Sequence, residues 1–422
     1  DKIIGTLAYQ KSNADEKQKL KLKSHLDILR AIAFKFNPTA NFFAPYCGLF
    51  GMVSRDFINP IDNIGENNDA LNGPDYIFYF LDNMFVVNHK EKKTYFVSNA
   101  IITDNNREKA WHECGKTINN YEKVIAQKLP KGKKYGKKEL KVDYDSGKGE
   151  LPAVMKDLRR HILDGDMLLA SPSRKIITGY NAEPLDIYAR LKGISGNNFC
   201  YIHDRDGISI CYGSKAILNV KGNSDRSIEL KISTAAKPRA VFKEGIEKDL
   251  DNKYEALLKI DENEIDYHIL VVDSMRNDIA KVSKPGTRYV DKLFVVEKGP
   301  NSQNIMSSVK GTLREGIDVL HAFSATLNPC AINGYPKIKS ASILENLEKE
   351  KNGMASASVL FITPDKCLQG AAMNPIRIKK DKAYIGISSR VFNNSSDENE
   401  INANNNELAN IIGAINAAGN KK

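Results

Sequence analysis

The chain has 422 residues, of which 41% are hydrophobic and 27% charged, so it can bury one large core or two closely packed ones. It has no run of about 18 apolar residues, and residues 1–10 lack the basic-then-apolar order of a signal peptide. We therefore expect a globular cytoplasmic protein with no membrane partner.

The cysteines, histidines and lysines limit the classes of site. Six cysteines and seven histidines are dispersed without a Cys-x-x-Cys pair, so neither a zinc site nor a disulfide framework is indicated. The net charge is +10, and much of the excess lies in the run KLPKGKKYGKKELK at 128–141. Because only Tyr135 could stack on a base there, we interpret this run as a solvated loop and expect no nucleic-acid partner.

The predicted elements mix hairpins with amphipathic helices. Apolar residues recur at helical spacing over 151–163, before Gly165, while 269–272 fits a strand or a helix turn equally well. This mixture, without regular strand-helix alternation, favours an α+β fold over a doubly wound sheet. In chain order, we predict strands at 48–56, 76–80, 84–87 and 167–170, a hairpin of 199–202 with 208–212, helices at 315–327, 341–348 and 407–418, and loops in the Asn-rich stretches 63–72 and 393–406.

Short motifs follow one another in a fixed order along most of the chain. The motifs are GLFG at 48–51, Pro74-Asp75, Pro172-Ser173-Arg174, Lys237-Pro238-Arg239, HILVVD at 268–273, Arg276-Asn277-Asp278, Pro285-Gly286, Gly311 and NGYPK at 333–337. They resemble those of the chorismate-utilising enzymes, and among these most closely anthranilate synthase component I, with the strongest likeness over 231–345.

This resemblance implies antiparallel sheets in a central sandwich with helices packed outside. It also implies the family reaction of tryptophan biosynthesis, in which chorismate and ammonia give anthranilate and pyruvate. The expected partners are chorismate or a related small molecule and a glutamine amidotransferase subunit, and the expected cofactor is a magnesium ion held by two Glu-x-x-Glu pairs. The family pattern divides the chain into a truncated N-terminal region (1–125), a Lys/Gly-rich loop (126–147) and a chorismate-binding-like domain (148–422), with the family's Leu-Leu-Glu-Ser segment expected upstream of Asp1.

The metal positions implied by the resemblance are only partly acidic. Glu264 falls on the first glutamate of the first pair, but Tyr267 falls on the second, and a phenol is a poor magnesium ligand. Glu264 is therefore either a residual metal ligand or a surface acid in an acidic neighbourhood. In the second pair the family glutamates correspond to Glu400 and Ala403, or, after a one-residue slip, to Asn399 and Asn402.

At other family positions, too, reactive side chains are replaced by unreactive or obstructing ones. The catalytic His corresponds to Asn304, whose amide cannot shuttle a proton near neutral pH, and a catalytic Thr to Ala331. The Thr, Arg and Lys of the substrate-binding loops correspond to Ala236, Lys237 and Lys337. The arginine that holds a carboxylate falls on Asn374, unless a small gap brings in Arg377; the Gly-Ala-Gly loop is Ser388-Ser389-Arg390, and the Ser-Pro-Glu element is Ser214-Lys215-Ala216.

Two functions follow, from different classes. The motif order predicts an anthranilate synthase component I-like enzyme, while the substitutions predict a non-catalytic ligand-binding or scaffolding subunit that keeps the fold. An isochorismate or salicylate synthase is less consistent with the residues, because Leu169 or a neighbour occupies the place of the lysine that activates water in those relatives. We interpret Arg276-Asn277-Asp278 as a structural polar network, in a polar turn directly after a buried apolar segment.

Overall fold

Most of the chain is described by a computed structural model. The described residues are 26–34, 47–58, 64–65, 67–68, 73–102, 106–128, 140–192, 198–223, 225–242, 245–299, 302–348, 350–351, 356–364 and 366–419.

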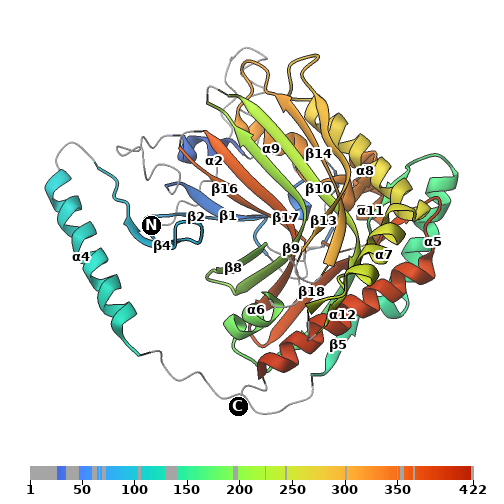
Figure 1. The fold of residues 1–422 in the computed structure, drawn as a ribbon, viewed down its shortest axis with the longest axis horizontal. Helices are drawn as coiled ribbons and strands as arrows, with labels where there is room; N and C mark the ends of the chain where they lie inside the picture. The colour runs from blue at the N-terminus through green and yellow to red at the C-terminus, as the bar shows by residue number, and fades with distance from the viewer. Residues whose placement is uncertain are drawn as a thin grey trace.

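The centre of the protein is one twelve-stranded sheet (Figure 1). Its main path runs β13-β14-β10-β9-β17-β16-β1-β2, and all pairs between its strands are antiparallel. Its strands are β1 (Leu49–Ser54), β2 (Tyr76–Phe80), β5 (Val142–Asp145), β7 (Ser173–Gly179), β8 (Phe199–His203), β9 (Ile208–Lys221), β10 (Ser227–Pro238), β13 (Tyr289–Lys298), β14 (Ser302–Thr312), β16 (Ala357–Ile362), β17 (Cys367–Lys379) and β18 (Lys382–Ser388).

The two longest strands join two parts of this sheet. The later part of β9 and the early part of β17 lie between β10 and β16, whereas their other ends pair with β8 and β18. The register of the β9–β17 pair shifts on both sides of Met373, which leaves Gly213 and Lys215 without cross-strand partners. A β-bulge of this kind bends a strand and increases its twist. The bend separates two layers, as expected for a sandwich.

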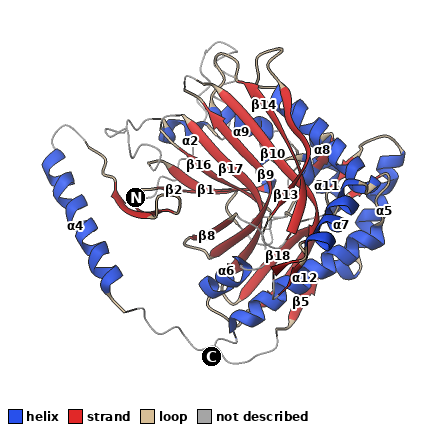
Figure 2. Ribbon diagram, viewed as in Figure 1, coloured by secondary structure: helices blue, strands red, loops and turns tan. Residues whose placement is uncertain are grey.

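Helices pack outside these layers (Figure 2). Helices α7, α8 and α9 cover the part of the sheet that contains β9, β10 and β14, and α6 and α12 cover the part around β8 and β18. Each part has its own apolar core. The helices are α2 (Asp27–Ala33), α4 (Arg107–Ala126), α5 (Glu150–Leu163), α6 (Pro184–Lys192), α7 (Lys248–Lys259), α8 (Glu262–Ala280), α9 (Val319–Thr326), α10 (Cys330–Asn333), α11 (Lys337–Glu348) and α12 (Asp397–Gly419).

The remaining strands are short or peripheral. Strands β3 and β4 form a separate hairpin, on which α4 packs through Phe85 and Tyr121. In Figure 1 this helix stands apart from the large sheet. The other strands are β3 (Asn83–Asn88), β4 (Lys93–Ser98), β6 (Leu169–Ala170), β11 (Val241–Phe242), β12 (Gly245–Ile246), β15 (Gly334–Tyr335) and β19 (Val391–Phe392).

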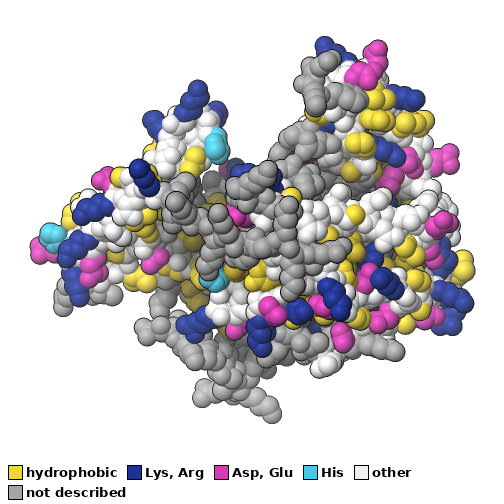
Figure 3. Space-filling model, turned by 90° about the horizontal axis from the view of Figure 1, so that it is seen from below, with side chains coloured by type: hydrophobic (Ala, Val, Ile, Leu, Met, Phe, Trp, Pro, Cys, Tyr) yellow, Lys and Arg dark blue, Asp and Glu magenta, His cyan; other side chains and the backbone are white. Residues whose placement is uncertain are grey.

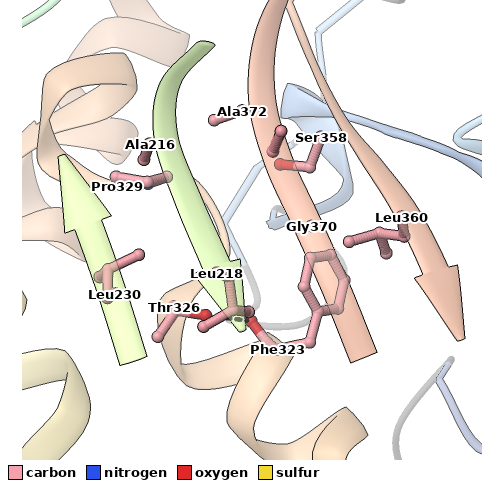
Figure 4. Close-up of a pocket in the computed structure, with 11 residues that line it drawn as sticks. Ala216, Leu218, Leu230, Phe323, Thr326, Pro329, Ser358, Leu360, Gly370 and Ala372 are labelled. Atoms are coloured by element: carbon pink, nitrogen blue, oxygen red, sulfur yellow. Dashed lines mark hydrogen bonds between the residues drawn. The ribbon is translucent and has the colours of Figure 1, made fainter. Parts of the chain in front are cut away.

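One cavity lies between the sheet and helix α9 rather than at the bend. Ala216 and Leu218 of β9, Gly370 of β17 and Phe323 of α9 line it, with Ser358 of β16 at one side (Figure 4). Its volume of about 20 Å³ accommodates about one water molecule. This cavity is therefore too small to hold a substrate.

Most of the predicted elements are confirmed, and the α+β class with them. The alternatives for 269–272 are resolved in favour of a helix, because these residues lie within α8. The prediction of a loop over 393–406 is wrong from Asp397 onward, since α12 begins there. Asparagine is a weak helix former, but the burial of Glu400 and Asn404 against the rest of the site outweighs that preference.

The three predicted regions are not structurally independent. Strands β1 and β2, from the predicted N-terminal region, extend the same sheet as the rest, because β1 pairs with both β2 and β16. The predicted loop over 126–147 is partly regular, since β5 occupies 142–145 and pairs with β7. Residues 129–139 of the lysine-rich run lie outside the described part of the chain.

On the face shown in Figure 3, basic and acidic side chains are interspersed.

Candidate functional site

The site is built around the guanidinium of Arg390, in the segment that joins β18 to β19. Its Nη1 and Nη2 atoms donate to the two carboxylate oxygens of Glu264 on α8, at 2.6 and 3.0 Å. Its Nε atom donates to Oε1 of Glu400 on α12 at 2.9 Å, and its backbone N–H donates to Oε2 of the same residue, also at 2.9 Å. One arginine therefore joins two helices that are far apart in the sequence.

The aromatic ring of Tyr267 forms the floor beneath this arginine. The ring is buried and packs against Phe392 at a centroid distance of 5.7 Å, while the guanidinium carbon of Arg390 lies 4.8 Å from the ring centroid. Burial raises the pKa of the Tyr267 hydroxyl above its ordinary value. Tyr267 consequently acts as a neutral packing surface that contributes a cation–π contact, and its phenol is not poised to become a metal ligand.

The pKa of Arg390 is raised above its ordinary value. Burial alone would lower it, but the hydrogen bonds to Glu264 and the charge of Glu400 outweigh that effect. The guanidinium is about a quarter exposed, and the Glu400 side chain is 9% exposed, so solvent screens the ion pair only partly. Arg390 is a permanent cation here.

Glu264 lies in the first turn of helix α8. The side chain of Asp261 caps it by accepting a hydrogen bond from the backbone N–H of Glu264 at 3.3 Å. One turn later His268 is fully buried between Thr234 and Ser307, whose hydroxyls lie 2.5 and 2.7 Å from its two ring nitrogens. Burial lowers the pKa of His268 to about 4, so the imidazole is neutral near pH 7 and holds the helix to the sheet.

Helix α12 supplies the opposite wall. Glu400 and Asn404 are buried, and the amide of Asn404 donates to the hydroxyl of Ser389 at 2.6 Å. Ala403 is exposed, and so are Asn399 and Asn402. It is therefore Glu400, as in the ungapped register, that meets Glu264 across the site.

The carboxylates present do not fit a magnesium ion. Both oxygens of Glu264 and both oxygens of Glu400 are bonded to Arg390, and the positions predicted for the second glutamate of each pair hold the buried ring of Tyr267 and the exposed methyl group of Ala403. Magnesium requires an open octahedral set of oxygen ligands. Among the described residues, no group of three or more His, Cys, Asp or Glu side chains is placed to hold a metal.

Lys337, predicted to bind substrate, is held inside the protein. Its ammonium donates to Oδ2 of Asp278 at 2.7 Å and to the carbonyls of Ala325 and Leu327 at 3.2 and 2.9 Å. An ammonium has three N–H donors, and all three have partners here. In this arrangement Lys337 secures the end of α9 to α8 rather than facing a ligand.

The Arg276-Asn277-Asp278 run belongs to the same structural network, as interpreted from the sequence. The Tyr335 hydroxyl donates to Asp273 at 3.1 Å and accepts a hydrogen bond from Asn277 at 2.5 Å. These contacts connect the middle of α8 to the chain just before α11. The run is helical, however, and does not form the polar turn that the sequence suggested.

Asn374 and Arg377 have different surroundings on β17. The amide of Asn374 donates to Glu407 of α12 at 3.3 Å, and Tyr212 of β9 donates to the same carboxylate at 3.2 Å. The buried guanidinium of Arg377 instead donates to both oxygens of Asp204, at 2.5 and 2.9 Å. Arg377 is thus engaged in a structural ion pair, and Asn374 is the residue that faces α12.

The remaining predicted positions lie on the neighbouring strands and on α10. Asn304 and Ala236 are direct cross-strand partners on β14 and β10, so two substituted family positions do come together. Lys237 lies beside them, with Nζ 3.9 Å from a carboxylate oxygen of Asp261. Ala331 is buried in the core, and Ser388 ends β18 opposite Ser173.

Two cations of the site were not anticipated. From the sequence, Arg390 was placed only at the last glycine of the family's Gly-Ala-Gly loop, and Lys215 only at the proline of the Ser-Pro-Glu element, whose acid falls on Ala216. Lys215 occupies the bulge of β9, where burial lowers its pKa, and the charges of Glu407, Arg55, Arg390 and Glu400 act on it. The sequence did contain a clue to these two cations. Each basic residue stands where the family pattern has an uncharged residue, a glycine in one case and a proline in the other.

Comparison with known proteins agrees with this fold and motif order. The family model described as chorismate binding enzyme matches residues 3–406. The chain belongs to this family. Among curated members, it is 27% identical over 412 residues to anthranilate synthase component 1 of Buchnera aphidicola subsp. Schizaphis graminum, covering 96% of this chain and 78% of that protein. It is 29% identical over 358 residues to the Haemophilus influenzae protein of the same name, covering 83% and 66%.

Solved structures of this chorismate-binding family share the fold. Anthranilate synthase component I from Streptococcus pneumoniae superposes with a TM-score of 0.78 at 21% identity, covering 92% of this chain and 85% of that one. The menaquinone-specific isochorismate synthase of Escherichia coli gives a TM-score of 0.66 at 10% identity, covering 92% and 81%. The sandwich with helices outside is therefore the anthranilate synthase component I-like fold. None of the described helices combines the length and apolar character needed to cross a bilayer.

Proposed function

We propose that this chain is a non-catalytic member of the chorismate binding enzyme family, a cytoplasmic ligand-binding or scaffolding subunit associated with tryptophan biosynthesis. The observation that carries the proposal is the engagement of Glu264 and Glu400 by Arg390. Anthranilate formation in the family depends on a cation that meets the substrate and on a proton-transferring residue. Here the two acids are already paired, and Asn304 stands at the histidine position.

The neighbouring substitutions support the same conclusion. An amide at Asn304 neither accepts nor releases a proton near neutral pH. Ala236, its cross-strand partner, has no hydroxyl, and the preceding residue, Ala235, has a φ of 44°, a left-handed conformation that favours glycine. This part of the site therefore offers neither a proton-transferring group at Asn304 nor a hydroxyl at Ala236.

The second candidate function is the amination of chorismate itself. The similarity to anthranilate synthase component 1 proteins along nearly the whole chain favours it, and a glutamine amidotransferase subunit would then supply the ammonia. The two functions make opposite predictions for the purified protein.

The test is an assay of the purified protein with chorismate, ammonium and Mg²⁺, with anthranilate followed by its fluorescence. The Haemophilus influenzae relative, assayed in parallel, sets the sensitivity. Our proposal predicts no anthranilate, and chorismate affinity, measured by calorimetry, that does not change with Mg²⁺. Anthranilate formation that requires Mg²⁺ and ammonium would establish the second function.

Restoring the family residues provides a matched series. A double variant, Tyr267→Glu with Asn304→His, should remain inactive because Arg390 still occupies the two carboxylates. Adding Arg390→Gly to this double variant removes the guanidinium from the two carboxylates, and adding Ala403→Glu completes the second acidic pair. Activity in the double variant alone would contradict the role assigned to Arg390, and circular dichroism of each variant checks that it folds.

A further inference from the structure

The arrangement around Arg390 is more than the loss of a metal site. All four oxygens of Glu264 and Glu400 contact the same residue, three through its guanidinium and one through its backbone N–H. We propose that Glu264 and Glu400 still form a cation site, that Arg390 fills it as a built-in cation, and that divalent metal ions are thereby kept out.

Occupation by Arg390 and by a metal ion is mutually exclusive. The guanidinium nitrogens lie 2.6 to 3.0 Å from the carboxylate oxygens of Glu264 and Glu400. A divalent ion would need the same oxygens at about 2.0 to 2.6 Å. Since the ion and the guanidinium would overlap, a metal could enter only if Arg390 swung away from Glu264, Glu400 and the ring of Tyr267 together.

The covalent attachment of Arg390 makes that displacement unfavourable. Its side chain is held at the site by the chain itself, so it competes with a free ion at a high effective concentration. Its backbone N–H also bonds Glu400 at 2.9 Å, a contact that a rotation of the side chain alone does not release. Magnesium, which gives up its water ligands reluctantly, is poorly suited to displace it.

Charge balance is consistent with this replacement. A divalent ion would bring two positive charges to the site. Arg390 supplies one. Lys215 stands close enough for the charges of Glu407 and Glu400 to favour its charged form, while burial lowers its pKa. Both cations belong to the chain, and both stand where the family pattern has uncharged residues. All four carboxylate oxygens of the two glutamates thus have a partner in the chain without any metal.

The proposal is tested by titrating the purified protein with Mn²⁺ and measuring free Mn²⁺ by electron paramagnetic resonance. The wild-type protein and an Arg390→Lys variant, which keeps a cation, should leave the Mn²⁺ signal unchanged up to millimolar concentrations. The variant Arg390→Gly should bind one Mn²⁺ with a dissociation constant on the order of 1 mM or below, a range typical of sites with few carboxylates. A double variant, Arg390→Gly with Glu264→Gln, should lose that binding.

Two results would overturn the proposal. One is Mn²⁺ binding by the wild-type protein that disappears in Glu264→Gln, since it would mean that Arg390 does not exclude metals. The other is a folded Arg390→Gly variant that binds no Mn²⁺, since the two glutamates would then not form a site. The wild-type titration decides the first point even if the glycine variant does not fold. Anthranilate formation is not measured here, so failure of the proposed function and failure of this proposal remain distinguishable.

Discussion

Replacing Lys337 by methionine should destabilise the protein strongly, because the ammonium is part of a buried ion pair. Lys337 and Asp278 are only 10% and 4% exposed, and their charged atoms are 2.7 Å apart. Removing one member of such a pair costs about 3 to 5 kcal/mol, since the other charge stays buried. Asp278 keeps Lys281 as a partner at 3.0 Å, so we expect about 3 kcal/mol for Lys337→Met.

The assay is urea unfolding followed by circular dichroism. Lys339→Met is the matched control, because Lys339 lies on the same helix and pairs with Asp166 while about half exposed. Its removal should cost less than about 1 kcal/mol. In Lys337→Met combined with Asp278→Asn, the loss should be smaller than the sum of the two single losses. If Lys337→Met is as stable as the control but binds chorismate more weakly, Lys337 is a ligand-binding residue and our structural assignment fails.

Two further predictions concern a buried histidine and a helix cap. Burial lowers the pKa of His268 to about 4 from an ordinary 6.5. The stability that depends on its neutral form is therefore complete above pH 6.5 and is lost as the pH falls toward 4. The loss amounts to at most about 3 kcal/mol. Urea titrations at pH 7, 5.5 and 4.5 should therefore show a shallower pH dependence for His268→Asn, and equal slopes would refute this. Asp318 caps α9 through the backbone N–H groups of Leu320 and His321 and accepts from Arg30 at 2.6 Å. Asp318→Ala should cost about 1 to 2 kcal/mol in the same assay and Asp318→Asn less, because an asparagine retains the cap.

Most of the helices and strands predicted from the sequence are confirmed, because local residue patterns determine them. Helix α5 has its buried residues at Leu151, Met155 and Leu158, a spacing that is visible without a structure. The motif order indicated the family, and the match of the family model to residues 3–406 confirms it. The start of α12 could not be predicted, because its asparagines favour a loop and only the contacts of Glu400 and Asn404 with distant residues decide otherwise.

The candidate site was predictable as a set of positions but not as a set of contacts. The sequence indicated that Tyr267 and Asn304 replace family residues, and it placed Glu264 and Glu400 at metal positions. It could not indicate that Arg390 joins those two acids, since the contact with Glu264 spans 126 residues. Nor could it indicate that Lys337 is bound by Asp278 and two carbonyls, because helix ends and their partners are defined only by the folded chain.

The contact of Arg390 with Glu264 and Glu400 affects how acidic residues in relatives should be interpreted. Once an arginine stands at this position, replacement of either glutamate would leave a guanidinium facing a neutral group, so selection for stability alone would preserve both acids. A genome survey that scores such chains by their remaining glutamates would then count them as metal-dependent enzymes. The residue to inspect first is the one at position 390: a glycine leaves the acids open to an ion, and an arginine accounts for them without one.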